Sequence, residues 1–154
     1  IPELKLSDKD YVVPKRRYSG FFQTDLDILL RELGVQTVVM TGLHAHMCVR
    51  HTSADAFSLG YDVVVAKQAT DSFTEEDYQN GLAYLKTCYG ADAYTNEELI
   101  AMFIHRGPAR PRFFFPQCRC FHPEGHTNDA DVRGVIFICI STALCLYLSV
   151  IRRE

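Results

Sequence analysis

The sequence predicts an α/β fold: a three-layer α/β/α sandwich built around a parallel sheet. Short apolar, β-branched runs alternate over the first 104 residues with segments whose apolar residues recur at helical spacing. Glycines and prolines separate the two kinds of segment. Strands that alternate with helices in this way form parallel sheets covered by helices.

The first predicted elements are a strand, a helix and a second strand. Residues 11–13 form the first strand, which Pro14 ends, because proline is tolerated at strand ends. Thr24 is expected to cap the helix, and Gly34 to end it. The apolar residues of this helix are Leu26, Leu29, Leu30 and Leu33. Residues 35–41 follow as a buried strand.

The same alternation continues to residue 104. A helix is predicted over 47–59, stopped by Gly60, and a strand over 62–66. Thr74 opens a helix with an acidic first turn that ends at Gly90. Residues 92–94 are predicted as the last strand of the pattern, and Thr95 caps a helix ending near Ile104.

Composition limits the class of protein. The 154 residues are 47% hydrophobic and carry a net charge of −3, which suits one globular domain. The cluster Lys15-Arg16-Arg17 is isolated, so no nucleic-acid partner is expected. The six cysteines lack the spacing of a disulfide framework, and no signal peptide opens the chain, so a reduced, cytoplasmic setting is expected.

Cys48 is the most informative single residue. It lies just past a predicted strand, in the first turn of the next helix, where open α/β sheets form their ligand crevices. The dipole at a helix amino terminus stabilises negative charge, so a thiolate nucleophile is one interpretation. The alternative is a small buried hydrophobic residue, which is the commoner role of a free cysteine.

The segments around Cys48 and Lys15 carry a family resemblance. Residues 41–56 read TGLHAHMCVRHTSADA, and residues 15–21 read KRRYSGF. They resemble the nucleophile and lysine segments of the isochorismatase-like cysteine hydrolases, a family that includes nicotinamidases and ureidoacrylate amidohydrolases. The resemblance covers roughly residues 8–104.

The resemblance implies a chemistry. The family hydrolyses a C–N (amide) bond of a small molecule through a cysteine thioester, using an Asp–Lys–Cys triad. Cys48 and Lys15 match the cysteine and lysine; without the resemblance, Lys15 would be read as an ordinary solvated charge. The triad aspartate, which belongs in an Asp-x-Gln-x-Asp-Phe-like segment, has no counterpart. We therefore expect a hydrolase that is inactive as this chain; the alternative is a non-catalytic remnant, or an assembly or membrane-tethered protein of the same fold.

Further site residues follow from the same resemblance. The backbone N–H groups of His44 and Cys48 are implied as the oxyanion hole, with a cis peptide bond between Leu43 and His44. Tyr18 and Phe21 are implied as substrate-pocket residues. The expected partner is a small-molecule amide, and the complete protein is expected to be a homo-oligomer.

No metal ligand is expected in this chain. In the nicotinamidase branch the ligands of the divalent metal, such as zinc, lie in a segment that would precede Ile1. His44, His46 and His51 are therefore interpreted as pocket lining or polar helix surface. Cys118, Cys120, His122 and His126 form a C-x-C-x-H-x₃-H pattern whose first spacing is unusual for zinc.

The resemblance also predicts an incomplete sheet. The family's strand order resembles the doubly wound order 3-2-1-4-5-6, and the first two strands would lie in the portion expected before Ile1. The strand at Tyr11 would then lose its neighbour, and the strand at Val38 would expose an apolar edge, which favours aggregation.

The carboxyl-terminal third differs in character. Residues 105–134 lack periodicity and are interpreted as an irregular linker. Residues 135–151 are an uncharged apolar run, at the lower limit for a membrane helix, and arginines follow it. We favour an incidental extension over a membrane helix that would make the protein membrane-associated. Packing into the core ranks last, because a helix cannot replace the hydrogen bonds of a missing strand.

Overall fold

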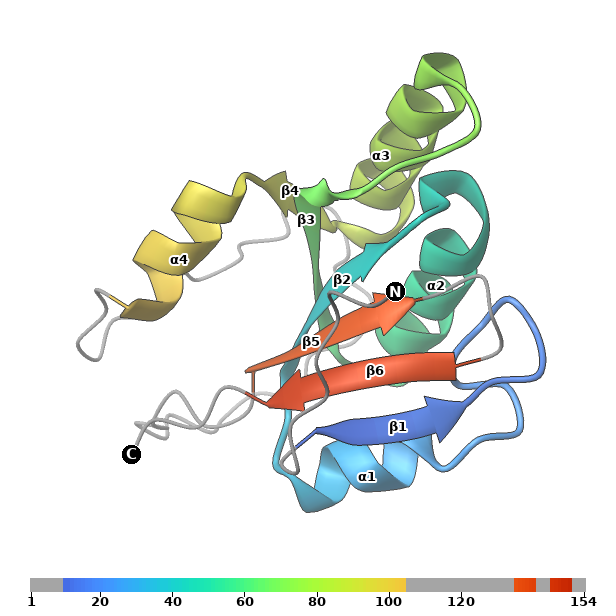
Figure 1. Ribbon diagram of the computed structural model, residues 1–154, viewed down its shortest axis with the longest axis vertical. Coiled ribbons are helices and arrows are strands. Elements are labelled where there is room, and N and C mark those ends of the chain that lie inside the picture. Colours follow the sequence, from blue (N-terminus) through green and yellow to red (C-terminus); the bar gives the residue numbers. More distant parts are fainter. Residues whose placement is uncertain (1–9, 105–134, 141–144, 151–154) are drawn as a thin grey trace, which may run out of the picture.

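The computed structural model describes residues 10–104, 135–140 and 145–150, and confirms the predicted α/β fold (Figure 1). The predicted linker 105–134 and its Cys/His pattern lie outside these residues. The elements are β1 (Tyr11–Pro14), α1 (Leu26–Glu32), β2 (Thr37–Gly42), a π-helical turn η1 (Ala45–Val49), α2 (Arg50–Ser58), β3 (Asp62–Thr70), α3 (Glu75–Tyr89), β4 (Asp92–Tyr94), α4 (Asn96–Ile104), β5 (Val135–Ile140) and β6 (Cys145–Val150).

Two threonines start helices as the sequence predicts. The Thr74 hydroxyl accepts the N–H of Asp77 at 3.1 Å at the start of α3. The Thr95 hydroxyl accepts the N–H of Glu98 at 3.2 Å, and the Glu98 carboxylate accepts the N–H of Thr95 at 2.7 Å. This reciprocal pair is a capping box, which satisfies two donors that the first turn of α4 would otherwise leave unpaired.

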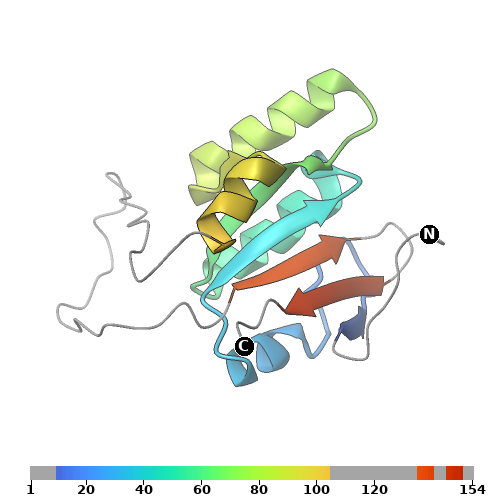
Figure 2. The same ribbon diagram turned by 60° about the vertical axis from the view of Figure 1, so that its left-hand side comes forward.

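The sheet has the order β1-β6-β5-β2-β3-β4. Strands β5, β2, β3 and β4 run parallel, with Val38 paired to Ile136 on one side and to Val63 on the other. Strand β6 runs antiparallel to both of its neighbours, β5 and β1 (Figure 2). The parallel sheet is therefore interrupted by one antiparallel strand, as is common in large mixed sheets.

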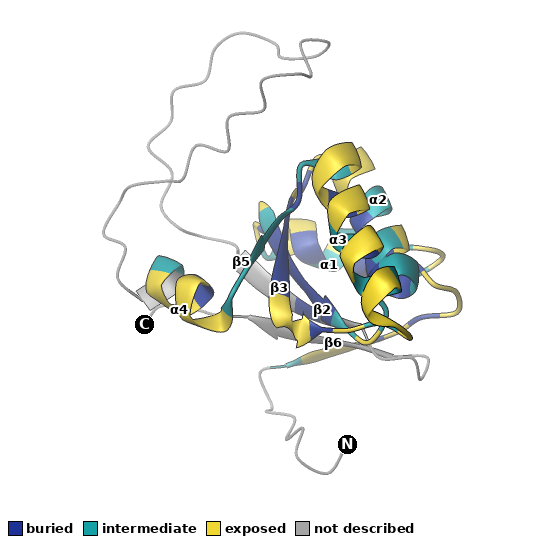
Figure 3. Cartoon of the chain, turned by 90° about the horizontal axis from the view of Figure 1, so that it is seen from above, coloured by how far each residue is buried: buried dark blue, intermediate teal, exposed yellow. Residues whose placement is uncertain are grey.

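Helices cover both faces of the sheet, which makes three layers (Figure 3). Helices α1, α2 and α3 pack on one face through fully buried residues that include Leu30, Ala56 and Leu85. Helix α4 packs on the other face, where Leu99 joins Val39 and Val64. The larger core thus lies on the face that also carries Cys48.

The described parts of the apolar run at 135–151 are strands, which corrects the expectations of an incidental extension and of a membrane helix. These strands are β5 and β6, and they lie between β1 and β2. Ile138 has no exposed surface and belongs to the larger core. In the described part of the chain no helix is long and apolar enough to cross a membrane.

The position of these strands also overturns the expected open edge. In a doubly wound order 3-2-1-4-5-6, the two places between the third and fourth strands belong to the first two strands. Here β5 and β6 lie in those places, between β1 and β2. Because they are extended rather than helical, they supply β2 with the backbone hydrogen bonds that a parallel neighbour provides.

Candidate active site

Cys48 lies in a π-helical turn at the carboxyl end of β2. Strand β2 ends at Gly42, and the π winding closes with a 3.2 Å hydrogen bond from the N–H of Val49 to the carbonyl of His44. The α-helix begins only at Arg50, whereas the sequence predicts one helix over 47–59. Cys48 is 5% exposed. A π turn of this kind is frequent at functional sites.

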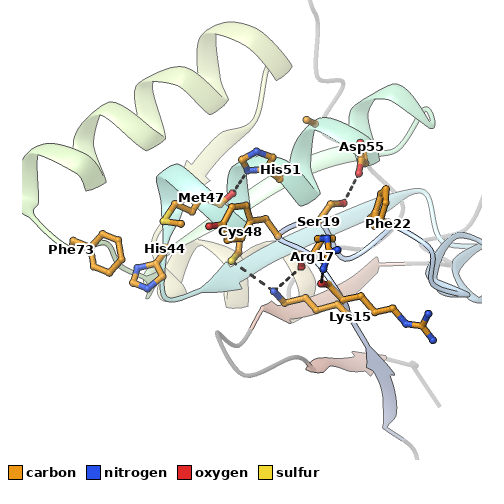
Figure 4. Close-up of a pocket in the computed structure, with 13 residues that line it drawn as sticks. Lys15, Arg17, Ser19, Phe22, His44, Met47, Cys48, His51, Asp55 and Phe73 are labelled. Atoms are coloured by element: carbon orange, nitrogen blue, oxygen red, sulfur yellow. Dashed lines mark hydrogen bonds between the residues drawn. The ribbon is translucent and has the colours of Figure 1, made fainter.

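Lys15 contacts Cys48, as the resemblance implies (Figure 4). The Lys15 ammonium donates to Sγ of Cys48 at 3.7 Å and to the carbonyl of Arg17 at 3.2 Å. Lys15 is only 5% exposed. A buried ammonium costs free energy unless polar atoms compensate it, and here its two acceptors are this sulfur and this carbonyl oxygen.

Helix α2 holds the loop that follows Lys15. The N–H of Gly20 donates to the Thr52 hydroxyl at 3.0 Å, and that hydroxyl donates to the carbonyl of Cys48 at 2.8 Å. The Ser19 hydroxyl donates to the Asp55 carboxylate. Thr52 is completely buried. One helix therefore fixes both the nucleophile turn and the loop opposite it.

A pocket of about 730 Å³ opens in front of Cys48. Its size suits a small-molecule site. Its walls combine charged, aromatic and apolar side chains, several of which are labelled in Figure 4. The lining residues are Lys15, Arg16, Arg17, Tyr18, Ser19, Phe22, His44, Met47, Cys48, His51, Ala54, Asp55 and Phe73.

Of the two predicted pocket residues, Tyr18 lines the pocket and Phe21 does not. Phe21 packs against the larger core and stacks on Tyr61, with ring centroids 6.0 Å apart. Phe22 lines the pocket in its place. The two neighbouring rings therefore lie in different surroundings, Phe21 against the core and Phe22 in the pocket wall.

His44 lies in the pocket, but the peptide bond before it is trans, which corrects the expected cis bond between Leu43 and His44. Trans is the lower-energy isomer by about 3–4 kcal/mol for a non-proline residue. The His44 ring packs on Phe73 with centroids 4.2 Å apart. Its Nδ1 is buried and makes no hydrogen bond within the described residues.

The other two histidines of the segment are held by hydrogen bonds. Nδ1 of His51 lies 2.7 Å from the carbonyl oxygen of Met47, so Nδ1 is the donor, because a carbonyl oxygen can only accept. Nδ1 of His46 lies 2.9 Å from the Ser72 hydroxyl. The described ranges contain no group of three His, Cys, Asp or Glu side chains able to hold a metal ion.

Some pocket residues were not predicted from the sequence. Phe73 comes from the loop after β3. Its position in the sequence could have predicted this role, because loops at the carboxyl ends of parallel strands line the ligand crevice. Phe22, Met47 and Ser19 flank predicted site residues, and no periodicity distinguishes their orientation from that of their neighbours.

A comparison with protein families matches residues 1–98 to the model described as the Isochorismatase domain. Among curated relatives, ureidoacrylate amidohydrolase RutB of Pantoea ananatis is 42% identical over 91 residues, covering 58% of this chain and 36% of the relative.

Solved structures of proteins with related names also superpose on this chain. An isochorismatase-like hydrolase from Alkaliphilus metalliredigens superposes with a TM-score of 0.63 at 41% identity, covering 66% of this chain and 56% of the other. N-carbamoylsarcosine amidase from Thermoplasma acidophilum gives a TM-score of 0.57 at 40% identity, covering 62% and 53%. The chain therefore spans between about a third and about half of the length of these relatives.

Proposed function

Because this chain belongs to the isochorismatase family, we propose that Cys48 is the nucleophile of a hydrolase site for the C–N bond of a small-molecule amide. The observation that carries the proposal is the buried contact between the Lys15 ammonium and the Cys48 sulfur, in the wall of a pocket of small-molecule size. The names of the relatives support the bond type, since RutB is an amidohydrolase and the Thermoplasma protein is an amidase.

The proposed reaction has two stages. Sγ of Cys48 attacks the amide carbonyl carbon, a C–S bond forms, and the C–N bond breaks as the amine leaves with a proton. Water then hydrolyses the thioester and restores the thiol. Lys15 stabilises the negative sulfur, and the backbone N–H groups of His44 and Cys48 are the proposed donors to the carbonyl oxygen as it becomes negative.

The described part of the site lacks a group placed to protonate the leaving amine. An amine leaves readily only when an acid protonates it. Within the described residues neither Lys15 nor Cys48 contacts a carboxylate; the pocket carboxylate, Asp55, accepts the Ser19 hydroxyl instead. We therefore propose that these 154 residues do not turn over amides by themselves. The same observation favours the second candidate, a non-catalytic protein of the same fold.

An activated ester separates the two candidates. The p-nitrophenolate group of p-nitrophenyl acetate leaves without protonation, so a working nucleophile needs no acid to be acylated. The proposed site predicts one acetyl group on Cys48, detected by peptide mass spectrometry, and a burst of p-nitrophenolate that Cys48→Ala abolishes and Cys88→Ala does not. A chain in which Cys48 is acetylated no faster than the exposed Cys88 would favour the non-catalytic protein.

A further inference from the structure

The described part of the site serves a nucleophile better than it serves a leaving group. Sγ of Cys48 receives the Lys15 ammonium at 3.7 Å, and both side chains are only 5% exposed. A cation at this distance stabilises a negatively charged sulfur, which is the form that attacks carbonyl carbons.

The acid–base groups that line the pocket have other partners. The Asp55 carboxylate accepts the Ser19 hydroxyl, and Nδ1 of His51 donates to the carbonyl of Met47 at 2.7 Å. An acyl donor whose leaving group must take up a proton, such as an amide, is therefore poorly served here.

A thioester needs no acid to lose its leaving group. Alkyl thiols titrate at about pH 8.5, so a thiolate departs near neutral pH without first being protonated. When Sγ of Cys48 attacks the carbonyl carbon of a thioester, a new C–S bond forms, the old C–S bond breaks, and its electron pair leaves on the departing sulfur. Because no proton is transferred, this step needs only groups that the described site contains.

The pocket has the volume and the surface for an acyl chain. Its volume is about 730 Å³, and Figure 4 shows Met47 and Phe73 to one side of Cys48 and Phe22 to the other. Phe22 and Phe73 are 46% and 67% exposed, so both rings offer apolar surface that a ligand can cover. Each methylene group that becomes buried strengthens binding by about fourfold.

We propose that Cys48 exchanges acyl groups between thiols, taking an acyl group from one thioester and passing it to a second thiol. The proposal rests on the proposed function for the role of Cys48 as nucleophile and goes beyond it in the class of acyl donor and acceptor.

The second half of the exchange reverses the first. The thiolate of the acceptor attacks the carbonyl carbon of acylated Cys48, and Sγ leaves with the electron pair beside the Lys15 ammonium. Since the two halves are the same step in opposite directions, the groups that serve one also serve the other.

The first test compares acyl donors on the 154-residue chain. S-hexanoyl-N-acetylcysteamine is expected to place one hexanoyl group on Cys48, detected by peptide mass spectrometry, at least about fivefold faster than on Cys88. Cys88 is the exposed cysteine, so a Cys48 without activation would react more slowly than Cys88. The matching amide, N-hexanoyl-N′-acetylethylenediamine, is expected to modify neither. A thioester reaction no faster at Cys48, or an equally fast reaction of the amide, would overturn the proposal.

The second test asks whether the acyl chain lies in the pocket. The ratio of hexanoyl transfer to acetyl transfer is expected to be at least about tenfold higher at Cys48 than at Cys88. Phe73→Ala should lower this ratio, whereas Phe57→Ala, which truncates a 41% exposed ring outside the pocket lining, should not. Equal ratios at the two cysteines would overturn the pocket as the acyl site.

The third test follows the complete exchange. The chain is mixed with the hexanoyl thioester and 2-mercaptoethanol, and S-hexanoyl-2-mercaptoethanol is measured by chromatography. Its formation should exceed the uncatalysed rate, fall to that rate in Cys48→Ala and persist in Cys88→Ala. Acylation of Cys48 without exchange would overturn the transfer activity. If p-nitrophenyl acetate acetylates Cys48 but the thioester does not acylate it, this inference fails and the proposed nucleophile stands; if neither reagent modifies Cys48, both fail.

Discussion

The Thr41 hydroxyl donates a hydrogen bond to the carbonyl of Ile138, 97 residues further along the chain, at 3.2 Å. Thr41 lies at the carboxyl end of β2, just before the turn that carries Cys48. The contact therefore joins a distant segment directly to the strand on which the site is built, and the pairing of β2 with β5 does so along the whole strand.

Ile138→Ala should destabilise the whole domain. Ile138 has no exposed surface and packs within the larger core, so truncation removes buried methyl groups and leaves a cavity. The expected loss is about 2–5 kcal/mol of the free energy of unfolding, measured by urea denaturation. Ile100→Ala is the control, because Ile100 is 54% exposed and its truncation should cost under about 0.5 kcal/mol. Equal losses for the two variants would show that β5 does not pack in this core.

A chain that ends at Ile104 should fold poorly and aggregate. Without β5 and β6, strand β2 loses one of its two partners and exposes its edge. Aggregation of the shortened chain would be the opposite of the outcome expected for an incidental extension or a membrane anchor, because removing either of these should improve solubility. Size-exclusion chromatography and near-UV circular dichroism of the two chains distinguish these outcomes. A monomeric, cooperatively unfolding chain 1–104 would contradict the sheet order.

Lys15→Met should slow the reaction of Cys48 without lowering stability. The ammonium lies 3.7 Å from Sγ, so its removal disfavours the negatively charged sulfur that attacks electrophiles. Alkylation of Cys48 by iodoacetamide should slow by about fivefold or more, while alkylation of Cys88 stays constant.

The melting temperature of Lys15→Met should stay the same or rise, because methionine fills a similar volume and removes a buried charge. Unchanged alkylation of Cys48 would mean that Lys15 has no electrostatic influence on the sulfur.

Gly81→Ala should displace the nucleophile turn. A Cβ at Gly81, on α3, would lie 2.9 Å from the backbone nitrogen of His46 and 3.0 Å from Cβ of Ala45. Because the contact is with backbone, η1 or α3 must move, at a cost of about 1–3 kcal/mol. Denaturation measures this cost, with Asn80→Ala on the exposed surface of α3 as the control. A Gly81→Ala chain as stable as the control would contradict the close packing of α3 on η1.

Alkaline pH should reveal the bond between Tyr61 and Asp27. The Tyr61 hydroxyl donates to the Asp27 carboxylate at 2.7 Å. Burial, together with this bond, raises the pKa of Tyr61 to about 12. A pKa raised on folding gives stability that is fully present below the unfolded value near 10 and is lost as the pH rises through about 12.

Tyr61→Phe removes this contribution. It should cost about 0.5–1.5 kcal/mol at neutral pH, and the difference from the unmodified chain should shrink between about pH 10 and 12. Chemical denaturation at a series of pH values measures it. A difference that stays constant over this range would contradict the assigned bond.

Local signals predicted the elements from β1 to α4, because capping threonines, terminal glycines and apolar spacing act within a few residues. Thr74 with Gly90, and Thr95 with Glu98, are examples. The contact between Lys15 and Cys48 spans 33 residues, and spacing alone does not predict it; the resemblance of both segments to one family did.

The run at 135–151 could not be assigned from hydropathy. A continuous apolar run reads equally as a buried helix or as buried strands. The β-branched residues of 135–140 are compatible with a strand as well as with a helix, and only the edge of β2 decides what the run pairs with. Similarly, Phe21 and Phe22 are identical in chemistry, and no pattern in the sequence distinguishes the one that packs on the core from the one that lines the pocket.

Because β2 pairs with a strand made much later, this pairing cannot form until most of the chain has been synthesised. When β2 and the Cys48 turn leave the ribosome, the strand that pairs with β2 on its β1 side, β5, has not yet been made. At about 5–20 residues per second, the delay between the end of β2 and the end of β5 is about 5 to 20 seconds. During that interval the apolar edge of β2 is open to other chains, so this protein should depend on chaperones at a defined point in its translation rather than only after release.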